Sequence, residues 1–221
     1  MASRLGKFYK ILLDLFRSSS IILKYLWGIK VQDREHSYFW DVVTLNFKKL
    51  IDEKGFDNFQ NYLDMGCGQI AILGIYVKKK HSFINVTSID LYKEFIFNAR
   101  KTCKLNKVDI ILKESNLFSN VENKFDCITF NPPYKEKKKE TKLKFAKTTF
   151  SGKDGLFISK KFLGQASNYL KENGKIFLGI NNFFVPRKDC INMIYNSEFT
   201  LINEYKRKYN TSTIYELILE K

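Results

Sequence analysis

From Asp57 onward, short apolar runs alternate regularly with stretches of helical periodicity, and this alternation restricts the possible folds more than any other feature of the chain. Strands that alternate with helices favour a parallel sheet with right-handed crossover connections. The sequence therefore predicts an α/β fold. Five runs have the length and apolar character of buried strands: NYLDMG from Asn61, INVTSIDL from Ile84, VDIILKES from Val108, KFDCITFN from Lys124 and GKIFLGIN from Gly174.

The connections near the end of the chain differ from those in the middle. The stretch SKKFLGQASNYLKENG, which ends at Gly174, predicts a helix directly before the fifth strand. The tail, FTLINEYKRKYNTSTIYELILEK, contains two β-like runs on either side of NTST with no helix between them. These runs predict an antiparallel hairpin at one edge of the sheet. Together with the five earlier runs, they give a mostly parallel sheet of seven strands that is flanked by helices.

Residues 1–56 precede this alternation and contain apolar residues at helical spacing. We expect an N-terminal helical extension here that packs on the main domain, residues 57–221, or forms a lid or a substrate segment. A helix on a membrane surface is the alternative. A membrane span or a signal peptide does not fit, because charges interrupt the apolar stretches and no cleavage site follows. The apolar pattern is Leu5, Phe8, Leu12, Leu15 and Phe16, and the charges are Asp14, Arg17 and Lys24.

The composition limits the kinds of site that the chain can carry. It has 38 basic and 23 acidic residues and a net charge of +15, which permits a polyanionic partner. However, Lys, Asn, Ile and Phe are all abundant, which indicates a compositional bias of the source as a whole. On this interpretation, most of the lysines are solvated residues on the surface. The four cysteines form no CxxC pair and the two histidines form no HExxH motif. We therefore expect a reduced, cytoplasmic protein without a metal site.

The segment LDMGCGQIAIL places two glycines between the first predicted strand and the helix that follows it. Gly66 permits a tight turn, and Gly68 lets a ligand approach the backbone without a side chain in the way. With Ala71 they complete the pattern G-x-G-x-x-A, which is weak evidence alone because many α/β turns carry glycines. A nicotinamide-dependent enzyme stays open at this point.

Two carboxylates narrow the choice of ligand. Asp64 stands two residues before Gly66, and a carboxylate over this turn suits a positively charged amine better than a pyrophosphate. Asp90 ends the second strand and can accept hydrogen bonds from both ribose hydroxyls, although it could also cap the next helix. A nucleoside with an amino-acid tail satisfies both carboxylates, and S-adenosylmethionine fits that description.

With these features, the chain from about Phe59 to Lys221 resembles the class I S-adenosylmethionine-dependent methyltransferases. The resemblance rests on D-x-G-x-G, the acid that ends the second strand, the helix NARKTCKLNKV, and ESNLF after the third strand. It implies a Rossmann-like methyltransferase domain over residues 57–221 and S-adenosylmethionine as the cofactor.

The resemblance also implies where the cofactor binds. The family commonly has Asp at the position of Asn116, where it contacts the adenine amine, and the amide here can accept or donate a hydrogen bond. Leu91, Leu117 and Phe118 would form apolar walls around the adenine. The cofactor-binding residues expected on this basis are Asp64, Gly66, Gly68, Asp90, Leu91, Asn116, Leu117 and Asn131.

The fourth predicted strand ends at Asn-Pro-Pro-Tyr, on the carboxyl edge where open α/β sheets bind ligands. An amide or nucleobase nitrogen has a delocalised lone pair, so two acceptors that grip its N–H bonds would aim the lone pair at a methyl group. The side-chain oxygen of Asn131 and the carbonyl of Pro132 can supply these acceptors, and Pro132 and Pro133 stiffen the turn. Tyr134 can stack on the planar group. We therefore predict that Asn131, Pro132 and Tyr134 are catalytic.

This motif, NPPY, is similar to that of amino-methyltransferases that act on glutamine amides or on nucleobase amines. The segment SGKDGLFISKKFL further resembles the G-x-DGL segment of release-factor glutamine methyltransferases and ribosomal RNA guanine methyltransferases. The resemblance implies an S-adenosylmethionine-dependent N-methyltransferase whose acceptor is a planar amide or amine nitrogen of a protein glutamine or a nucleobase.

The residues that capture the acceptor are less well defined. We expect Pro133 in the turn, His36 and Tyr38 at the entrance of the site, and Phe183 at its mouth, although each aromatic residue could instead serve packing. The loop 135–147 carries seven lysines, which could clamp phosphates or an acidic partner or could simply be solvated.

Three alternative functions remain on the sequence alone. A small-molecule N-methyltransferase would use the same residues on a metabolite. A nicotinamide-dependent oxidoreductase would bind pyrophosphate at Gly66 and Gly68 and would give NPPY no role. An inactive, basic RNA-binding module would keep the fold without turnover. The oligomeric state and the identity of the acceptor are left open.

Overall fold

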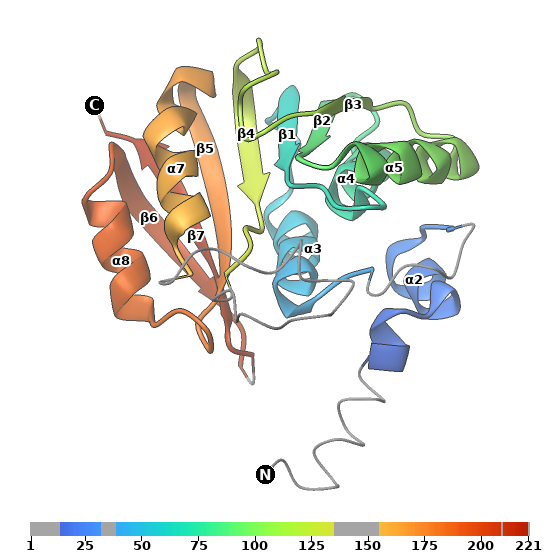
Figure 1. The fold of residues 1–221 in the computed structure, drawn as a ribbon, viewed down its shortest axis with the longest axis horizontal. Helices are drawn as coiled ribbons and strands as arrows, with labels where there is room; N and C mark the ends of the chain where they lie inside the picture. The colour runs from blue at the N-terminus through green and yellow to red at the C-terminus, as the bar shows by residue number, and fades with distance from the viewer. Residues whose placement is uncertain (1–13, 32–38, 135–154, 209, 221) are drawn as a thin grey trace, which may run out of the picture.

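The computed structural model describes residues 14–31, 39–134, 155–208 and 210–220. Its centre is one sheet with the strand order β3-β2-β1-β4-β5-β7-β6 (Figure 1). The strands from β3 to β5 pair in parallel, while β7 pairs antiparallel with both β5 and β6. The predicted α/β fold with seven strands and a C-terminal hairpin is confirmed. The strands are β1 Asn61–Met65, β2 Asn85–Asp90, β3 Ile111–Glu114, β4 Phe125–Phe130, β5 Leu170–Asn181, β6 Phe199–Lys206 and β7 Ser212–Leu219.

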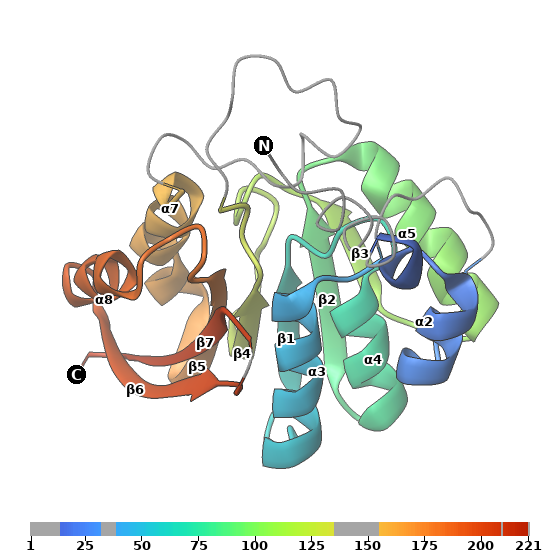
Figure 2. The ribbon, with the colours of Figure 1, turned by 90° about the horizontal axis from the view of Figure 1, so that it is seen from below.

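Helices lie on both sides of this sheet (Figures 1 and 2). Helices α4 (Ile72–Lys80) and α5 (Lys93–Asn106) connect β1 to β2 and β2 to β3, whereas α7 (Phe157–Ala166) connects β4 to β5 in the opposite direction along the sheet. Because such crossovers are right-handed, the reversal puts α7 on the face opposite α4 and α5. The last helix, α8 (Arg187–Tyr195), precedes β6. The strand order reverses between β1 and β4, which is where open α/β sheets bind ligands.

The described residues before β1 pack against the rest of the chain. Helix α2 (Ser20–Trp27) begins after Ser19, whose hydroxyl accepts from the Ile22 N–H at 3.3 Å. Helix α3 (Val42–Lys54) packs on β5 and β7 and lies beside α4. Helices are therefore present in the predicted N-terminal extension, and the division of the chain after residue 56 stays a prediction. Within the described residues, no helix is long and apolar enough to cross a membrane.

The helix before the fifth strand is shorter than the sequence indicates. The prediction that it runs to Gly174 is wrong, because α7 ends at Ala166 and one 3-10 turn, Ser167–Tyr169, leads into β5. Leu170 is buried and pairs with Phe125, so it belongs to the sheet. Asn173 then adopts a left-handed conformation (φ 59°), and regular pairing resumes at Lys175. The polar residues after Leu170 form an irregularity of the strand and not the last turn of a helix.

Helix α4 lies unusually close to β1 and β2. A Cβ atom built on Gly74 would lie 2.1 Å from Oγ of Ser88 and 3.4 Å from Oδ2 of Asp64. Without a side chain at this position, the Gly74 N–H donates to Asp64 Oδ2 at 3.1 Å. The buried carboxylate of Asp64 therefore ties the first turn of α4 to β1, next to the glycine turn.

This contact predicts that Gly74→Ala destabilises the protein by about 1–3 kcal/mol, because overpacking outweighs the better helix propensity of alanine. The matched control is Gly164→Ala in α7, where a new Cβ would meet no atom within 4 Å. We expect that variant to be neutral or stabilised by up to about 1 kcal/mol. Urea unfolding measures both, and equal effects at the two positions would contradict the argument.

Burial raises the pKa of Asp64 to about 7, and the Gly74 N–H opposes this shift only in part. Because the folded protein then binds this proton more tightly than the unfolded chain, the stability that the protonated carboxyl contributes is present at acidic pH. It is lost as the pH rises from about 4 to about 7.

We therefore expect the ligand-free Asp64→Asn variant to gain stability relative to the wild type between pH 5 and pH 8. The gain is at most about 4 kcal/mol, the equivalent of three pKa units. Asp109→Asn, at an exposed carboxyl group, serves as the control and should show no such gain. Denaturant unfolding at both pH values measures the difference, and a constant difference between wild type and Asp64→Asn would contradict the prediction.

Candidate active site

A cavity of about 220 Å³ lies at the carboxyl ends of β1, β2 and β4. Its position follows from the strand register, since Met65 of β1 pairs with both Ile89 of β2 and Phe130 of β4. The next residues of the three strands therefore emerge at the same level. The cavity brings together most of the predicted site residues: Gly66, Gly68, Asp90, Leu91, Asn116, Leu117, Asn131 and Pro133.

The glycine turn has the backbone that the sequence pattern requires. Gly66 and Gly68 have φ values of 67° and 68°, in the left-handed region that disfavours other residues. A Cβ on Gly66 would approach the Phe130 ring to 3.2 Å, whereas a Cβ on Gly68 would meet no atom within 4 Å. The missing side chain of Gly68 thus leaves open space at the wall of the cavity, and a ligand can approach the backbone there.

Asp90 joins this turn to the end of β2. Its Oδ2 accepts from the Gly68 N–H at 2.9 Å, and its Oδ1 accepts from the Tyr92 N–H at 3.1 Å. Burial raises the pKa of Asp90, and these backbone donors oppose that shift. The carboxylate lines the cavity and has about four acceptor sites, so it can both order the turn and accept a hydrogen bond from a ligand.

The far wall comes from the residues that follow β3. Asn116 and Leu117 line the cavity, and Leu117 has a left-handed backbone with φ 51°. Phe118, expected from the sequence as a third apolar wall, is instead buried in the core, where it stacks on Phe162 and Tyr169. Residues that the sequence analysis did not select take its place as lining: Met65, Tyr92, Phe95, Ser115, Phe130 and Ile158.

Asn131 lines the cavity with a side chain of fixed orientation. Its Nδ2 donates to Oδ1 of Asp41 at 3.2 Å and to Oγ1 of Thr44 at 3.3 Å. Its Oδ1 is buried and has no hydrogen-bond partner among the described residues. A buried carbonyl oxygen without a donor is costly, so this atom is available to bind the N–H of a ligand.

Two other residues of the turn, both predicted to be catalytic, are absent from the lining of the cavity. Pro132 and Tyr134 are buried and do not line the cavity. The Tyr134 hydroxyl donates to Oδ2 of Asp41 at 2.8 Å, and its ring stacks on Phe184 with the centroids 5.5 Å apart. Burial and the Asp41 carboxylate raise the pKa of Tyr134, so the hydroxyl keeps its proton. Phe183 packs edge-on against Phe184, and 75% of its surface is exposed.

Two predicted groups of residues lie elsewhere. Asp64 does not line the cavity, because its carboxylate points to Gly74 of α4. His36, Tyr38 and the lysine-rich loop 135–147 lie outside the described residues. Two larger cavities, of about 650 and 450 Å³, contain none of the predicted site residues.

The sequence analysis missed Asp41 and Thr44, which hold Asn131. They form the N-terminal cap of α3: the Thr44 N–H donates to Asp41 Oδ1 at 2.8 Å, and the Asp41 N–H donates to Thr44 Oγ1 at 3.4 Å. An Asp three residues before a Thr, ahead of an apolar helical run, could have identified the cap. It could not have identified the contact with Asn131, which is 90 residues away along the chain.

Comparison with known proteins gives relatives of two kinds. A protein of Methanocaldococcus jannaschii that carries the name protein N5-glutamine methyltransferase is 34% identical over 154 residues, which cover 68% of this chain and 74% of that protein. The release factor glutamine methyltransferase of Streptococcus pneumoniae is 31% identical, with 62% and 51% covered. The ribosomal RNA small subunit methyltransferase C of Photorhabdus laumondii is 30% identical, with 69% and 40% covered. The chain therefore spans about half or less of the last two proteins.

Solved structures show the same fold at low identity. A methyltransferase from Pyrococcus furiosus has a TM-score of 0.66 at 21% identity, and the alignment covers 97% of this chain and 98% of that one. The 16S rRNA N2 G1207 methyltransferase of Thermus thermophilus, solved with AdoMet and guanosine, has a TM-score of 0.58 at 15% identity, with 85% and 45% covered.

The family described as "Methyltransferase small domain" matches residues 41–209. The match starts at Asp41 and includes β1 to β5 as well as every residue that lines the cavity. The resemblance predicted from the glycine turn and NPPY is thereby confirmed: the chain belongs to the methyltransferase small domain family.

Proposed function

We propose that this protein is an S-adenosylmethionine-dependent N-methyltransferase that acts on the planar amide or amine nitrogen of a protein glutamine or a nucleobase. The observation that carries the proposal is the side chain of Asn131: the residue lines the glycine-turn cavity, and its buried Oδ1 has no partner among the described residues. Family membership supports methyl transfer, and the names of the two glutamine methyltransferases support an amide nitrogen as the acceptor atom.

The residues on β1, β2 and the segment after β3 fit the cofactor. The open backbone at Gly68 accommodates the amino-acid part, Asp90 accepts from the ribose hydroxyls, and Leu91 and Leu117 contact the adenine, while the Asn116 amide meets its amine. When bound, the cofactor supplies an electrophilic methyl group on a sulfonium. Asp64 acts indirectly: it accepts a hydrogen bond from the Gly74 N–H and thereby holds the first turn of α4.

The NPPY turn binds the acceptor nitrogen. Asn131 Oδ1 and the Pro132 carbonyl accept the two N–H bonds, which turns the nitrogen lone pair out of conjugation and toward the cofactor. No general base is required before attack, because the proton becomes acidic only as the methyl group transfers. The proline pair removes backbone freedom, so the two acceptors keep their spacing. Pro133 lines the cavity and contacts the planar group.

Capture of the whole substrate involves groups outside the cavity. Phe183 is exposed and reaches the turn through Phe184 and Tyr134, so it offers an aromatic surface to a base or a peptide group. His36, Tyr38 and the lysines of 135–147 complete the proposed substrate site. We place the enzyme in the cytoplasm, in agreement with four buried cysteines that form no disulfide.

The acceptor class is tested by tritiated methyl transfer from S-adenosylmethionine into a cell lysate, with protein, nucleic-acid and low-mass pools counted separately. We expect label in protein or nucleic acid. Label in the low-mass pool alone would establish the small-molecule alternative. NADH and S-adenosylmethionine titrated in a calorimeter test the nicotinamide alternative, which family membership already disfavours.

Asn131→Ala should retain cofactor binding within about threefold and lower kcat by a factor of about 10²–10³, because one acceptor at the reacting nitrogen is lost. Asn196→Ala, at the exposed residue that caps the C-terminus of α8, is the matched control and should leave turnover unchanged. The labelled acceptor pool provides the assay. Full turnover in Asn131→Ala would overturn the proposed mechanism, because the NPPY turn would then have no role in the transfer.

Gly68→Ala should weaken S-adenosylmethionine binding by a factor of at least about 10. The new methyl group enters the cavity, and the left-handed backbone at this residue disfavours alanine by about 1–2 kcal/mol. Isothermal calorimetry measures the affinity, and urea unfolding measures the cost to the fold. Unchanged affinity would place the cofactor away from this turn.

A further inference from the structure

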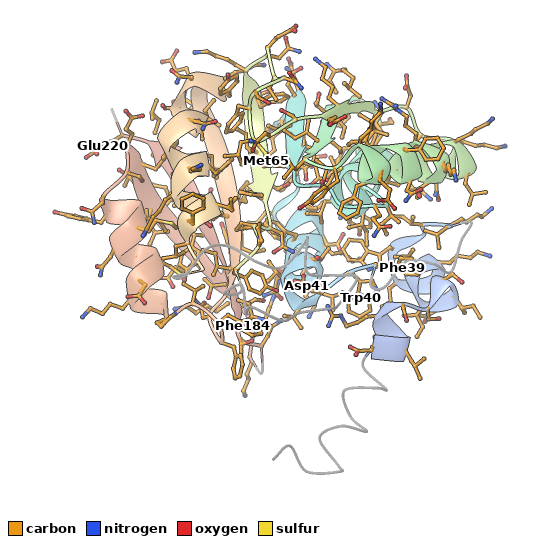
Figure 3. All side chains as sticks on the ribbon, viewed as in Figure 1. Phe39, Trp40, Asp41, Met65, Phe184 and Glu220 are labelled. Atoms are coloured by element: carbon orange, nitrogen blue, oxygen red, sulfur yellow. The ribbon has the colours of Figure 1, made fainter. Side chains whose placement is uncertain are left out.

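One carboxylate contacts both polar side chains of the NPPY turn. Asp41 Oδ1 accepts from Asn131 Nδ2 at 3.2 Å, and Asp41 Oδ2 accepts from the Tyr134 hydroxyl at 2.8 Å. Oδ1 also accepts from the Thr44 N–H and from Thr44 Oγ1, both at 2.8 Å. In Figure 3, Asp41 lies between the labelled Phe184 and Trp40, below Met65. The start of α3 is thus bound to residues about 90 positions later in the chain.

The chemistry of Asp41 decides which way the Asn131 amide faces. A carboxylate can only accept hydrogen bonds, so the NH₂ end of the amide must point toward Asp41 and the oxygen must point away from it. Thr44 Oγ1 gives its proton to Asp41 and therefore also acts as an acceptor toward Nδ2. A rotated amide would put its oxygen against two acceptors. The unpartnered, buried Oδ1 is the consequence of this arrangement.

We propose that Asp41 is a positioning residue, which fixes the Asn131 amide so that its oxygen faces the acceptor nitrogen. The inference rests on the proposed function, since it gives the orientation of the Asn131 side chain a role in the transfer. Asp41 is not among the residues that line the cavity, so in this proposal it acts through Asn131. The bond to Tyr134 holds the other end of the turn and prevents the diproline from tilting as a unit.

The alternative explanation is that Asp41 has only a structural role, as the N-cap of α3. Two substitutions separate the explanations, because Ser and Asn are both good N-cap residues. Asp41→Ser keeps an oxygen for the Thr44 N–H but is too short to reach Asn131 and Tyr134. Asp41→Asn keeps an acceptor toward Asn131, and its NH₂ group can donate to the Tyr134 hydroxyl. The first removes the positioning contacts, and the second conserves them without the charge.

The experiment measures transfer of tritiated methyl into the acceptor pool that the lysate experiment identifies. We expect Asp41→Ser to lower kcat about ten- to a hundredfold, as misplacement of a reacting group does, while the KM for acceptor and the Kd for S-adenosylmethionine change less than about threefold. Asp41→Asn should restore kcat to within about threefold of the wild type. Urea unfolding should give both variants a free energy of unfolding close to that of the wild type, because Ser and Asn can both cap α3.

A double-variant cycle supplies the sharper test. If Asp41 acts through Asn131, then Asp41→Ser in an Asn131→Ala background should lower kcat no further. If the two substitutions instead lower kcat by independent factors that multiply in the double variant, the inference is wrong. It is also wrong if Asp41→Ser has the kcat of the wild type while Asn131→Ala is inactive. Should Asn131→Ala itself be fully active, both the proposed function and this inference fail, because Asp41 would have nothing to position.

Discussion

The site depends on the register in which β2, β1 and β4 are paired. Met65 is paired with Ile89 on one side and with Phe130 on the other, in parallel. Gly66, Asp90 and Asn131 therefore leave the sheet together, although they are far apart in the sequence. A slip of one residue would turn the side chains of a strand to the opposite face. The hydrogen bond from Gly68 N–H to Asp90 exists only because this register is kept.

Three buried or partly buried carboxylates organise the loops around the cavity in the same way. Asp64 accepts from the Gly74 N–H, Asp90 from the Gly68 N–H, and Asp41 from the Thr44 N–H. Each thus satisfies a backbone donor at a turn or a helix start, where helical partners are missing. They differ in what else they reach: only Asp90 lines the cavity, whereas Asp41 and Asp64 stand behind its walls.

The parts of the site that the sequence predicted are those with a strong local signal. Strand, glycine turn and helix follow one another directly at Gly66 and Gly68, and two prolines mark the end of β4, so these positions could be recognised. The carboxylate at Asp90 followed from its place at a strand end. In each case the residue and its structural context lie within a few positions of each other.

The parts that were missed depend on contacts between distant segments. Nothing near Asp41 indicates Asn131 as its neighbour, and nothing near Gly74 indicates that Ser88 lies against it. Phe118 follows two residues that line the cavity, yet Phe162 and Tyr169 draw it into the core. The end of α7 was misjudged because the pairing of Leu170 with Phe125 overrides a sequence of good helix formers.

The bond between Asp41 and Asn131 bears on how a minimal working unit could be cut from this chain. A fragment that begins at the first strand would keep every residue of the cavity wall, but it would leave the amide of Asn131 free to rotate. It would also strip α3 from β5 and β7 and leave an apolar sheet face open to water. The shortest fragment that keeps this bond to Asn131 must therefore include Asp41 and the whole of α3.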